Sequence, residues 1–312
     1  MTTSPQADYV PPSSASMQAR QNDNDALRFL IAQRRLYSKA KRWLALRWFG
    51  MLIIGLGAPV VSVIWPNLAV VSGALAGLWI FLSQSVLINA QSNTVANAAA
   101  VQEQFDFYVF GMPSRVERST LPSMEEIAAV AGPDSDLQSN ALSRKLLDWY
   151  PINAEDPGNV TVAISQRANA SYSDRLLRST AVTWTSATVV WILALAAASI
   201  AVELSLITFL AGVLLPVLPS FLDVVRYVVG IRRAARDRGD LTRSIEGRLR
   251  NVDESVEGND LLVWQESMYD LRRSTPLVPD VIYKLKRAVN ERVMKTAASQ
   301  LRQQARRPVD GA

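Results

Sequence analysis

The sequence predicts an all-α membrane protein with four transmembrane helices in two tight hairpins and with cytoplasmic helical segments around them. Four runs of about 18 to 22 residues contain no ionisable side chain: Trp48–Trp65, Leu68–Ile88, Ala181–Val202 and Leu204–Leu222. The runs occur in two pairs, and positive charge gathers at the open end of each pair.

The length of each run matches the thickness of a bilayer. At about 1.5 Å of rise per residue, a helix of this length spans roughly the 30 Å hydrocarbon core. A long helix on the surface of a soluble protein would show a polar face, and none of the four runs does. The alternative is a soluble all-α protein that encloses four apolar helices, which a chain of 312 residues is poorly able to do.

Short connections and charge set the expected topology. Only Pro66 and Asn67 separate the first two runs, and only Glu203 separates the last two. Seven cations and no acid lie between Arg28 and Arg47, and further arginines precede the third run and follow the fourth, whereas the hairpin tips carry no cation. The positive-inside rule therefore places both termini and the middle segment in the cytoplasm.

Six segments follow from this topology: a disordered arm 1–24, a basic cytoplasmic helix 25–47, transmembrane hairpin 48–88, a cytoplasmic helical domain 89–179, transmembrane hairpin 180–223 and C-terminal cytoplasmic helices 224–312. Ser123, Glu126 and Gly132 predict a short helix with a capping box and a glycine stop. A helix before Pro151 and an unbroken helix from 159 into the third span are also expected, as is a break at Pro276 and Pro279.

The amino-acid composition excludes several classes of chemistry. The chain has no cysteine and no histidine, and it has no glycine-rich phosphate loop. Thiolate chemistry, imidazole bases and metal sites built from these ligands are excluded, so we expect no enzyme activity, no metal and no resident cofactor. No charged residue lies near the middle of a predicted span, which argues against an ion-coupled transporter.

Small residues mark a face of the second span. Ala69, Gly73 and Gly77 recur every fourth residue, a spacing that lets another helix approach closely. We interpret this face as a helix-packing seam that supports a homo-oligomer.

Four strings in the predicted cytoplasmic segments combine aromatic residues with Arg or Asp near a helix breaker: "FDFYVFGMPSR" (105–115), "DWYP" (148–151), "ISQRANASYSDRLLR" (164–178) and "YDLRRSTPLVPDVIY" (269–283). One interpretation is a set of helix junctions held by aromatic packing and Arg–Asp pairs. The other is a pocket, because aromatic rings stack on bases and arginines bind phosphates.

The candidate ligand-binding residues are Gln166, Arg167, Tyr172, Arg175, Trp149, Arg272 and Arg273. Arg167 and Arg175 are about two helical turns apart and share a face of a helix that continues into the third span. The alternative is structural: Arg175 anchors the end of the span, and Arg167 pairs with an acid such as Asp148.

These strings, together with "AQRRLYSKAKRW" at 32–43, occur in an order and around two hairpins that resemble the SMODS-associating four-transmembrane effector family. The resemblance covers about Asn24 to Leu301. We expect relatives to carry a cysteine within 164–170, where this chain has Ser165 and Ala170, so no thiol role carries over.

The resemblance implies a pore-forming effector of the bacterial inner membrane in anti-phage defence by abortive infection. A nucleotidyltransferase makes a cyclic oligonucleotide, and the effector oligomerises and permeabilises the lipid bilayer in response. No direct binding of DNA or RNA is expected. Two alternatives remain open: a membrane scaffold that recruits a cytoplasmic partner through 240–306, and a small constitutive channel or transporter.

Overall fold

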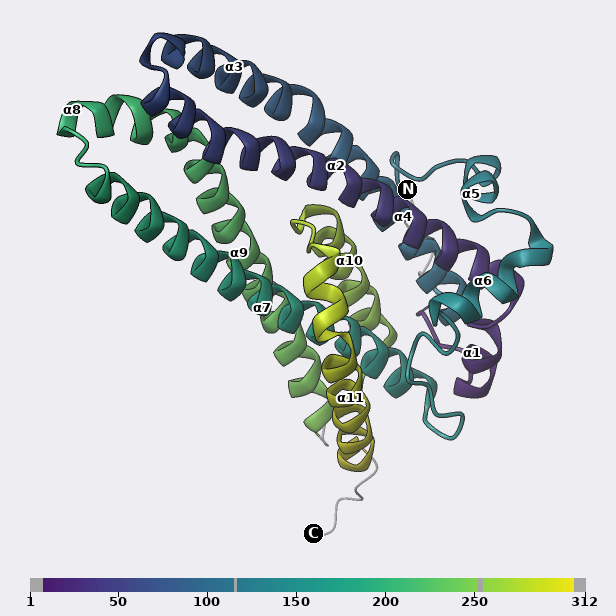
Figure 1. Cartoon of the computed structure of the whole chain (residues 1–312). Helices are drawn as coiled ribbons and strands as arrows, with labels where there is room; N and C mark the ends of the chain where they lie inside the picture. Colours follow the sequence, from purple (N-terminus) through teal and green to yellow (C-terminus); the bar gives the residue numbers. More distant parts are fainter. Residues whose placement is uncertain (1–7, 115–116, 252–254, 306–312) are drawn as a thin grey trace, which may run out of the picture.

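Two long pairs of helices form the frame of the protein (Figure 1). The computed structural model describes residues 8–114, 117–251 and 255–305. In the first pair, α2 (Asn24–Ile64) is followed by η1 (Pro66–Leu68) and returns as α3 (Ala69–Leu82), η2 (Ser83–Leu87) and α4 (Ile88–Phe110). In the second, α7 (Gly158–Ala201) returns as α8 (Leu206–Thr208), η4 (Phe209–Leu214) and α9 (Leu215–Arg250). Both connections are short turns at the positions that the sequence predicts.

Helices α2 and α7 are each continuous over their whole length. The side chain of Asp23 caps α2 by accepting a hydrogen bond from the backbone nitrogen of Ala26 at 3.0 Å. Glu203 adopts a left-handed conformation, with φ of 54°, at the turn after α7. With 41 and 44 residues, α2 and α7 are each roughly 60 Å or more in length. Each helix therefore reaches from one end of the molecule almost to the other.

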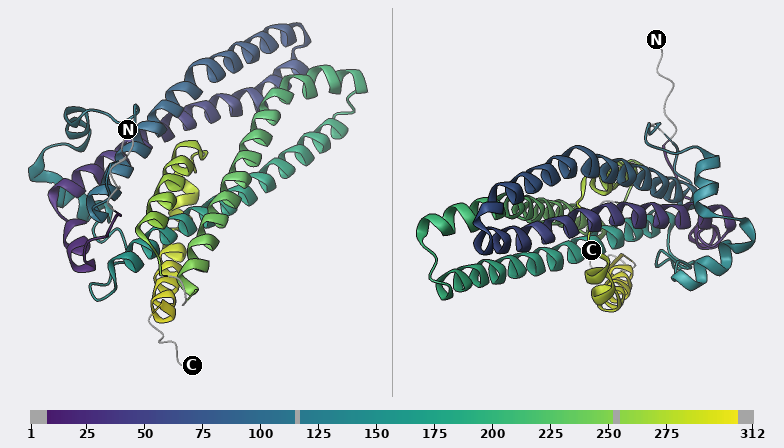
Figure 2. Two further views of the ribbon diagram at one scale, coloured as in Figure 1. Left: turned by 180° about the vertical axis from the view of Figure 1, so that it is seen from behind. Right: turned by 45° about the horizontal axis from the view of Figure 1, so that its top comes forward.

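The shorter helices gather at the open ends of the two pairs, away from the hairpin tips (Figures 1 and 2). They are α1 (Ser14–Arg20), α5 (Met124–Ala131), η3 (Asp134–Asp136), α6 (Leu137–Arg144), α10 (Gly258–Ser274) and α11 (Asp280–Ala305). Helix α10 contacts α4 of one pair and both α7 and α9 of the other. The C-terminal helices thus join the two pairs.

One hydrophobic core lies under these short helices. Its fully buried side chains come from both long pairs and include Leu30, Ile31, Phe105 and Ile245. The predicted segments 25–47, 89–179 and 224–312 therefore all contribute to this core, and smaller clusters, such as the one that contains Tyr227 and Ile231, are separate from it.

In contrast, the halves of the long helices near the hairpin tips have many exposed apolar side chains. Val70, Ile200 and Ile207 are 83%, 77% and 79% exposed. Among the described residues, Val70–Phe110 and Gly158–Ala201 are long and apolar enough to cross a membrane, and the pair Leu206–Leu214 and Val217–Arg250, bent by 57°, would be a third span. The predicted first run, Trp48–Trp65, forms the distal part of α2 up to Ile64, and it is not among these candidates from the described residues.

The predicted disordered arm differs from the structure over residues 8–24. Ser13 caps α1 through its side chain, and Met17 on this helix is fully buried. Tyr9 is 7% exposed and donates a hydrogen bond to the backbone oxygen of Phe110 at 2.7 Å. The polar composition concealed two apolar anchors that find partners far along the chain. Residues 1–7 lie outside the described part.

The middle segment shows one confirmed helix and one that ends early. Ser123 and Glu126 form the predicted capping box, and Gly132 ends α5. The helix expected to run to Pro151 instead ends at Arg144, because Lys145 and then Asp148 adopt left-handed conformations with φ of 55° and 51°. Residues 145–151 are consequently a loop.

Candidate ligand-binding site

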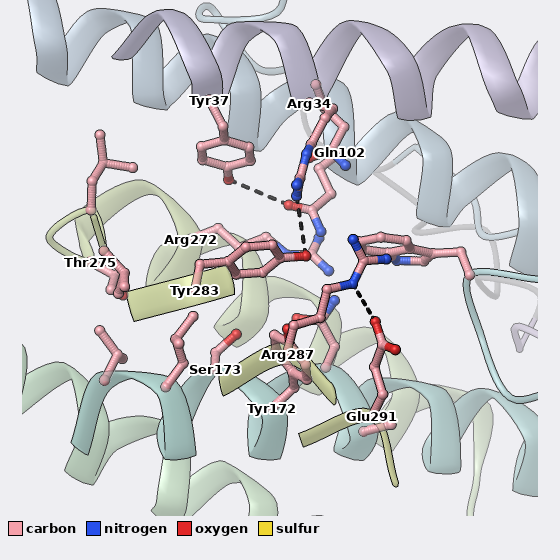
Figure 3. Close-up of a pocket in the computed structure, with 18 of the residues that line it drawn as sticks. Arg34, Tyr37, Gln102, Tyr172, Ser173, Arg272, Thr275, Tyr283, Arg287 and Glu291 are labelled. Carbon is pink, nitrogen blue, oxygen red and sulfur yellow. Dashed lines mark hydrogen bonds and ion pairs between the residues drawn. The ribbon is translucent and has the colours of Figure 1, made fainter. Parts of the chain in front are cut away.

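A cavity of about 550 Å³ lies where the two long pairs and the C-terminal helices meet (Figure 3). Its walls come from α2, α4, α7, α9, α10, α11 and the loop 145–151. The volume is within the range of about 300 to 1,000 Å³ that small-molecule sites occupy. The cavity is therefore large enough for a ligand, and both helix pairs contribute to its walls.

The strings that stand out in the sequence converge on this cavity. Segments 32–43, 148–151, 164–178 and 269–283 each contribute lining residues. The remaining string, 105–115, supplies Asp106, which contacts a lining arginine from behind. Residues dispersed along the chain thus come together at one place.

Positive charge exceeds negative charge in the lining. The acids are Asp148, Asp280 and Glu291, and the cations are Arg34, Lys41, Lys145, Arg238, Arg272, Lys284 and Arg287. Within the described residues, Lys41 pairs with Asp280 at 2.6 Å and Arg287 pairs with Glu291 at 2.5 Å. Four cations, namely Arg34, Lys145, Arg238 and Lys284, have no carboxylate in ion-pair contact there, so the cavity favours an anion.

Arg272 is fixed by a buried ion pair. Its Nη1 contacts Oδ2 of Asp106 at 2.5 Å, and the side chains are only 3% and 0% exposed. Asp106 also accepts hydrogen bonds from the Tyr150 hydroxyl at 2.5 Å and from Gln265 at 2.8 Å. Burial alone would lower the pKa of Arg272, but the Asp106 carboxylate outweighs it and holds the pKa above its ordinary value. The Nε and Nη2 atoms of Arg272 remain buried without a hydrogen-bond partner.

Arg238 lies beside Arg272 without a carboxylate of its own. It is 5% exposed, and its Nη2 donates to the backbone oxygen of Leu271 at 3.1 Å and to the Thr275 hydroxyl at 3.2 Å. Burial, and secondarily the charge of Arg272, lowers the pKa of Arg238 to about 10. Its Nε is also buried without a partner. Two adjacent cations thus leave three buried N–H groups that an anionic oxygen would satisfy.

Aromatic side chains supply the apolar part of the lining. They are Tyr37, Trp149, Tyr150, Tyr172 and Tyr283. The guanidinium of Arg34 lies 4.9 Å from the ring centre of Tyr283, and the Tyr172 and Tyr283 rings are 6.3 Å apart (Figure 3). Burial raises the pKa of the Tyr37, Tyr150 and Tyr172 hydroxyls, so they stay protonated at physiological pH.

The loop 145–151, which carries the lining residues Trp149 and Tyr150, has an unusual backbone conformation. Two of its residues, Lys145 and Asp148, have positive φ, which is uncommon for residues other than glycine. Asn22 holds Asp148 from two sides, since its amide donates to the carboxylate at 2.9 Å and its oxygen accepts from the Asp148 backbone nitrogen at 3.0 Å. Backbone strain of this kind persists where surrounding contacts fix it and is frequent at ligand sites.

The predicted site residues divide into three groups. Trp149, Tyr172 and Arg272 line the cavity. Arg273 lines a second, smaller cavity.

The other predicted residues bind neighbouring helices. Gln166 is fully buried and donates to the backbone oxygen of Leu261 at 2.9 Å. Arg167 contacts Glu246 at 2.6 Å, and not the suggested Asp148, while Arg175 donates to Asn290 at 3.3 Å. These three residues hold α7 against α10, α9 and α11.

Sequence reasoning missed several lining residues. Arg34, Tyr37 and Lys41 lie in the string 32–43, so their segment carried a signal although the individual residues did not. Tyr283 likewise ends the string 269–283. Arg238 was interpreted as one of the cations that orient the fourth span. Its spacing from Ile231, Ala234 and Leu241 places it on the buried face of the helix, a signal that could have distinguished it from the exposed Arg236.

The arrangement suits the binding of an anion with aromatic or apolar parts. Within the described ranges, no group of three or more carboxylates is placed to hold a metal ion. The cavity instead combines unpartnered guanidinium N–H groups with aromatic faces, which is how proteins bind phosphate esters of nucleosides.

The fold and the cavity together define a class: a helical, membrane-type protein with bare apolar helices at one end and an anion-favouring cavity at the other. The family model described as "SMODS-associating 4TM effector domain" matches residues 15–301. The chain therefore belongs to this family of four-transmembrane effector domains. No curated protein and no solved structure is detectably similar to it.

The two buried arginines make opposite contributions to stability, which a pair of variants should reveal. Arg272→Met strands the buried Asp106 carboxylate, so we expect a loss of about 3–5 kcal/mol in the free energy of unfolding. Arg238→Met removes a desolvated charge while Leu271 and Thr275 keep their mutual hydrogen bonds, so we expect a gain of about 1 kcal/mol. Thermal and denaturant unfolding of the purified proteins measures both.

The gain from Arg238→Met should depend on pH. Because the folded pKa of Arg238 is below that of an unfolded arginine, the native protein releases this proton first, and its stability rises with pH above about 10. The advantage of the variant should therefore shrink in that window. A destabilised Arg238→Met protein would mean that Arg238 is compensated by contacts other than the two described.

Proposed function

We propose that the protein is an effector of the bacterial inner membrane that permeabilises the bilayer when a cyclic oligonucleotide enters the cavity between its two helix pairs. The ligand would come from a functionally coupled nucleotidyltransferase, in an anti-phage response that stops the infected cell. Support for the pathway comes from the family, whose description reads "SMODS-associating" and "effector".

The observation that carries the proposed ligand class is the pair of buried arginines. Arg238 and Arg272 line a cavity of about 550 Å³, and three of their nitrogen atoms have no hydrogen-bond partner. A phosphodiester oxygen satisfies such donors and neutralises the surplus charge. The neighbouring Trp149, Tyr172 and Tyr283 rings offer surfaces on which bases stack. A cavity of about 550 Å³ is of the size that a small cyclic nucleotide would occupy.

The two longest helices support a mechanical connection between the cavity and the membrane. Arg34 and Lys41 lie on α2, and Tyr172 lies on α7. Both helices continue without interruption from the cavity into the exposed apolar halves at the hairpin tips. A ligand that moves α2 relative to α7 would therefore move the apolar halves too.

Ligand-triggered leakage is the direct test of this function. Proteoliposomes that contain the full chain and an enclosed dye should release the dye when one member of a panel of cyclic di- and trinucleotides is added. Arg238→Met should weaken the ligand response at least about tenfold, the scale of one charge-assisted hydrogen bond. The matched control is Arg144→Gln, an exposed cation on α6 outside the cavity, which should respond as the parent protein does.

Two results would contradict the function. Leakage without any ligand would favour a constitutive channel, and sealed vesicles under the whole panel would favour a scaffold. Equal loss of response in Arg144→Gln and Arg238→Met would remove the cavity from the mechanism.

Four spans with both termini in the cytoplasm are part of the proposal. Asn67 lies at a hairpin tip, whereas Ser135 and Ser244 lie near the opposite end, and all three are exposed. Because the chain has no native cysteine, single substitutions by cysteine report on each position alone. We expect an impermeant thiol reagent to label Asn67→Cys in spheroplasts and to label Ser135→Cys and Ser244→Cys only after lysis. Labelling of the last two in sealed spheroplasts would reverse the topology.

Self-association through the second span is also proposed. Gly73 and Gly77 are exposed, and a side chain built on either would meet nothing of the same chain within 4 Å. The side chain of Ala69 lies outside the described part. Gly73→Leu and Gly77→Leu should therefore fold normally but weaken chemical crosslinking between chains and reduce dye release. Gly57→Leu, at another open position, is the control, and unchanged crosslinking in both test variants would mean that this face contacts only lipid.

A further inference from the structure

A second cavity, of about 320 Å³, lies between the two helix pairs nearer to their apolar halves. It is lined by α2, η2, α4, α9 and the junction between α10 and α11. The cavity therefore touches both pairs at the place where their polar and apolar parts meet.

The charges of this cavity are not balanced. Arg47, Arg226 and Arg273 line it, and Asp223 is the one acid among its lining residues. Asp223 is 5% exposed, and its carboxylate is already bound by Arg47 at 2.7 Å and by the amide of Gln84 at 3.2 Å. Arg226 and Arg273 thus add positive charge that Asp223 does not offset.

Arg47 also carries an unused donor. The residue is 8% exposed, and only its Nη2 contacts Asp223, while its Nε is buried without a partner. A buried guanidinium nitrogen in this state favours an anionic acceptor in the adjoining space. The weak, exposed contact of Arg273 with Asp270 at 3.4 Å leaves its charge available.

The depth of the cavity follows from the charge-free runs. Arg47 directly precedes the run that begins at Trp48, Ile88 ends the second run, and Asp223 directly follows the fourth. Trp48, Trp184 and Tyr227 form one aromatic cluster here, with the two indole rings 4.4 Å apart. Tryptophan and tyrosine gather at the headgroup level of membranes, so the cavity lies at the level of lipid phosphates.

We propose that this cavity binds the phosphate of an anionic phospholipid, with Arg47, Arg226 and Arg273 as its ligands. Exposed apolar side chains of the adjoining helices, such as Val86 and Leu222, would contact the acyl chains. The surplus charge favours a headgroup with a net negative charge, such as phosphatidylglycerol, over a zwitterionic one. The proposal rests on the membrane placement of the proposed function but not on the cyclic oligonucleotide.

Native mass spectrometry of the full chain from mixed micelles tests the proposal. Short-chain phosphatidylglycerol should remain bound to the parent protein, and phosphatidylcholine should not. The double variant Arg226→Gln, Arg273→Gln should lower the affinity for phosphatidylglycerol at least tenfold. Both side chains are exposed, so the variant should fold, and an unchanged melting temperature in phosphatidylcholine checks this.

Arg233→Gln is the matched control, because Arg233 is an exposed arginine of α9 outside the cavity. Three outcomes would overturn the proposal: equal binding of both lipids, equal loss in the double variant and in Arg233→Gln, or full displacement of the lipid by glycerol 3-phosphate, which would identify a site for free phosphate esters. Dye release plays no part in this experiment, so its outcome is separate from that of the leakage test.

Discussion

The buried ion pair between Arg272 and Asp106 is the constraint on which the arrangement of the other helices depends. Two charges removed from water are stable only when geometry and hydrogen bonding are nearly complete. Asp106 meets this condition through Tyr150, Gln265 and Arg272, which fixes α4, the loop 145–151 and α10 relative to one another. Arg272 does not meet it, since two of its nitrogens lack partners. The same interaction therefore fixes the positions of these helices and leaves two buried N–H donors of Arg272 without an acceptor.

The aromatic lining extends this constraint to the remaining helix. Tyr283 of α11 lies under the cations Arg34 and Lys41 of α2, at 4.9 and 5.3 Å from its ring centre, and beside Tyr172 of α7. Cation–π contacts are worth about 0.5–2 kcal/mol. The cavity thus has the buried ion pair of Arg272 and Asp106 on one side and the cation–π contacts of Tyr283 on another.

Local sequence signals predicted the elements well. Charge-free runs, the capping box at Ser123 and the breakers at Pro276 and Pro279 are contiguous patterns that the chain shows directly, although the run Trp48–Trp65 is not among the span candidates of the described residues. The clustering of aromatic and charged strings also indicated which segments meet. Individual roles were less predictable, because the partner of each arginine comes from a distant helix: Glu246 for Arg167, Asp106 for Arg272 and no carboxylate for Arg238. Composition misled at the arm, where Tyr9 and Met17 are buried by contacts that no local pattern reveals.

Thr275 and Pro276 line both cavities, so one thin wall separates the two proposed sites. This wall is tied to α9, because the Tyr227 hydroxyl donates to the backbone oxygen of Leu277 at 2.7 Å. Any occupant that displaces the wall changes the space offered to the other, and thermodynamic linkage makes that influence mutual. If both proposals hold, the ligand concentration needed for a response would depend partly on the lipid composition of the membrane. A cell would then be able to change this threshold without altering the protein.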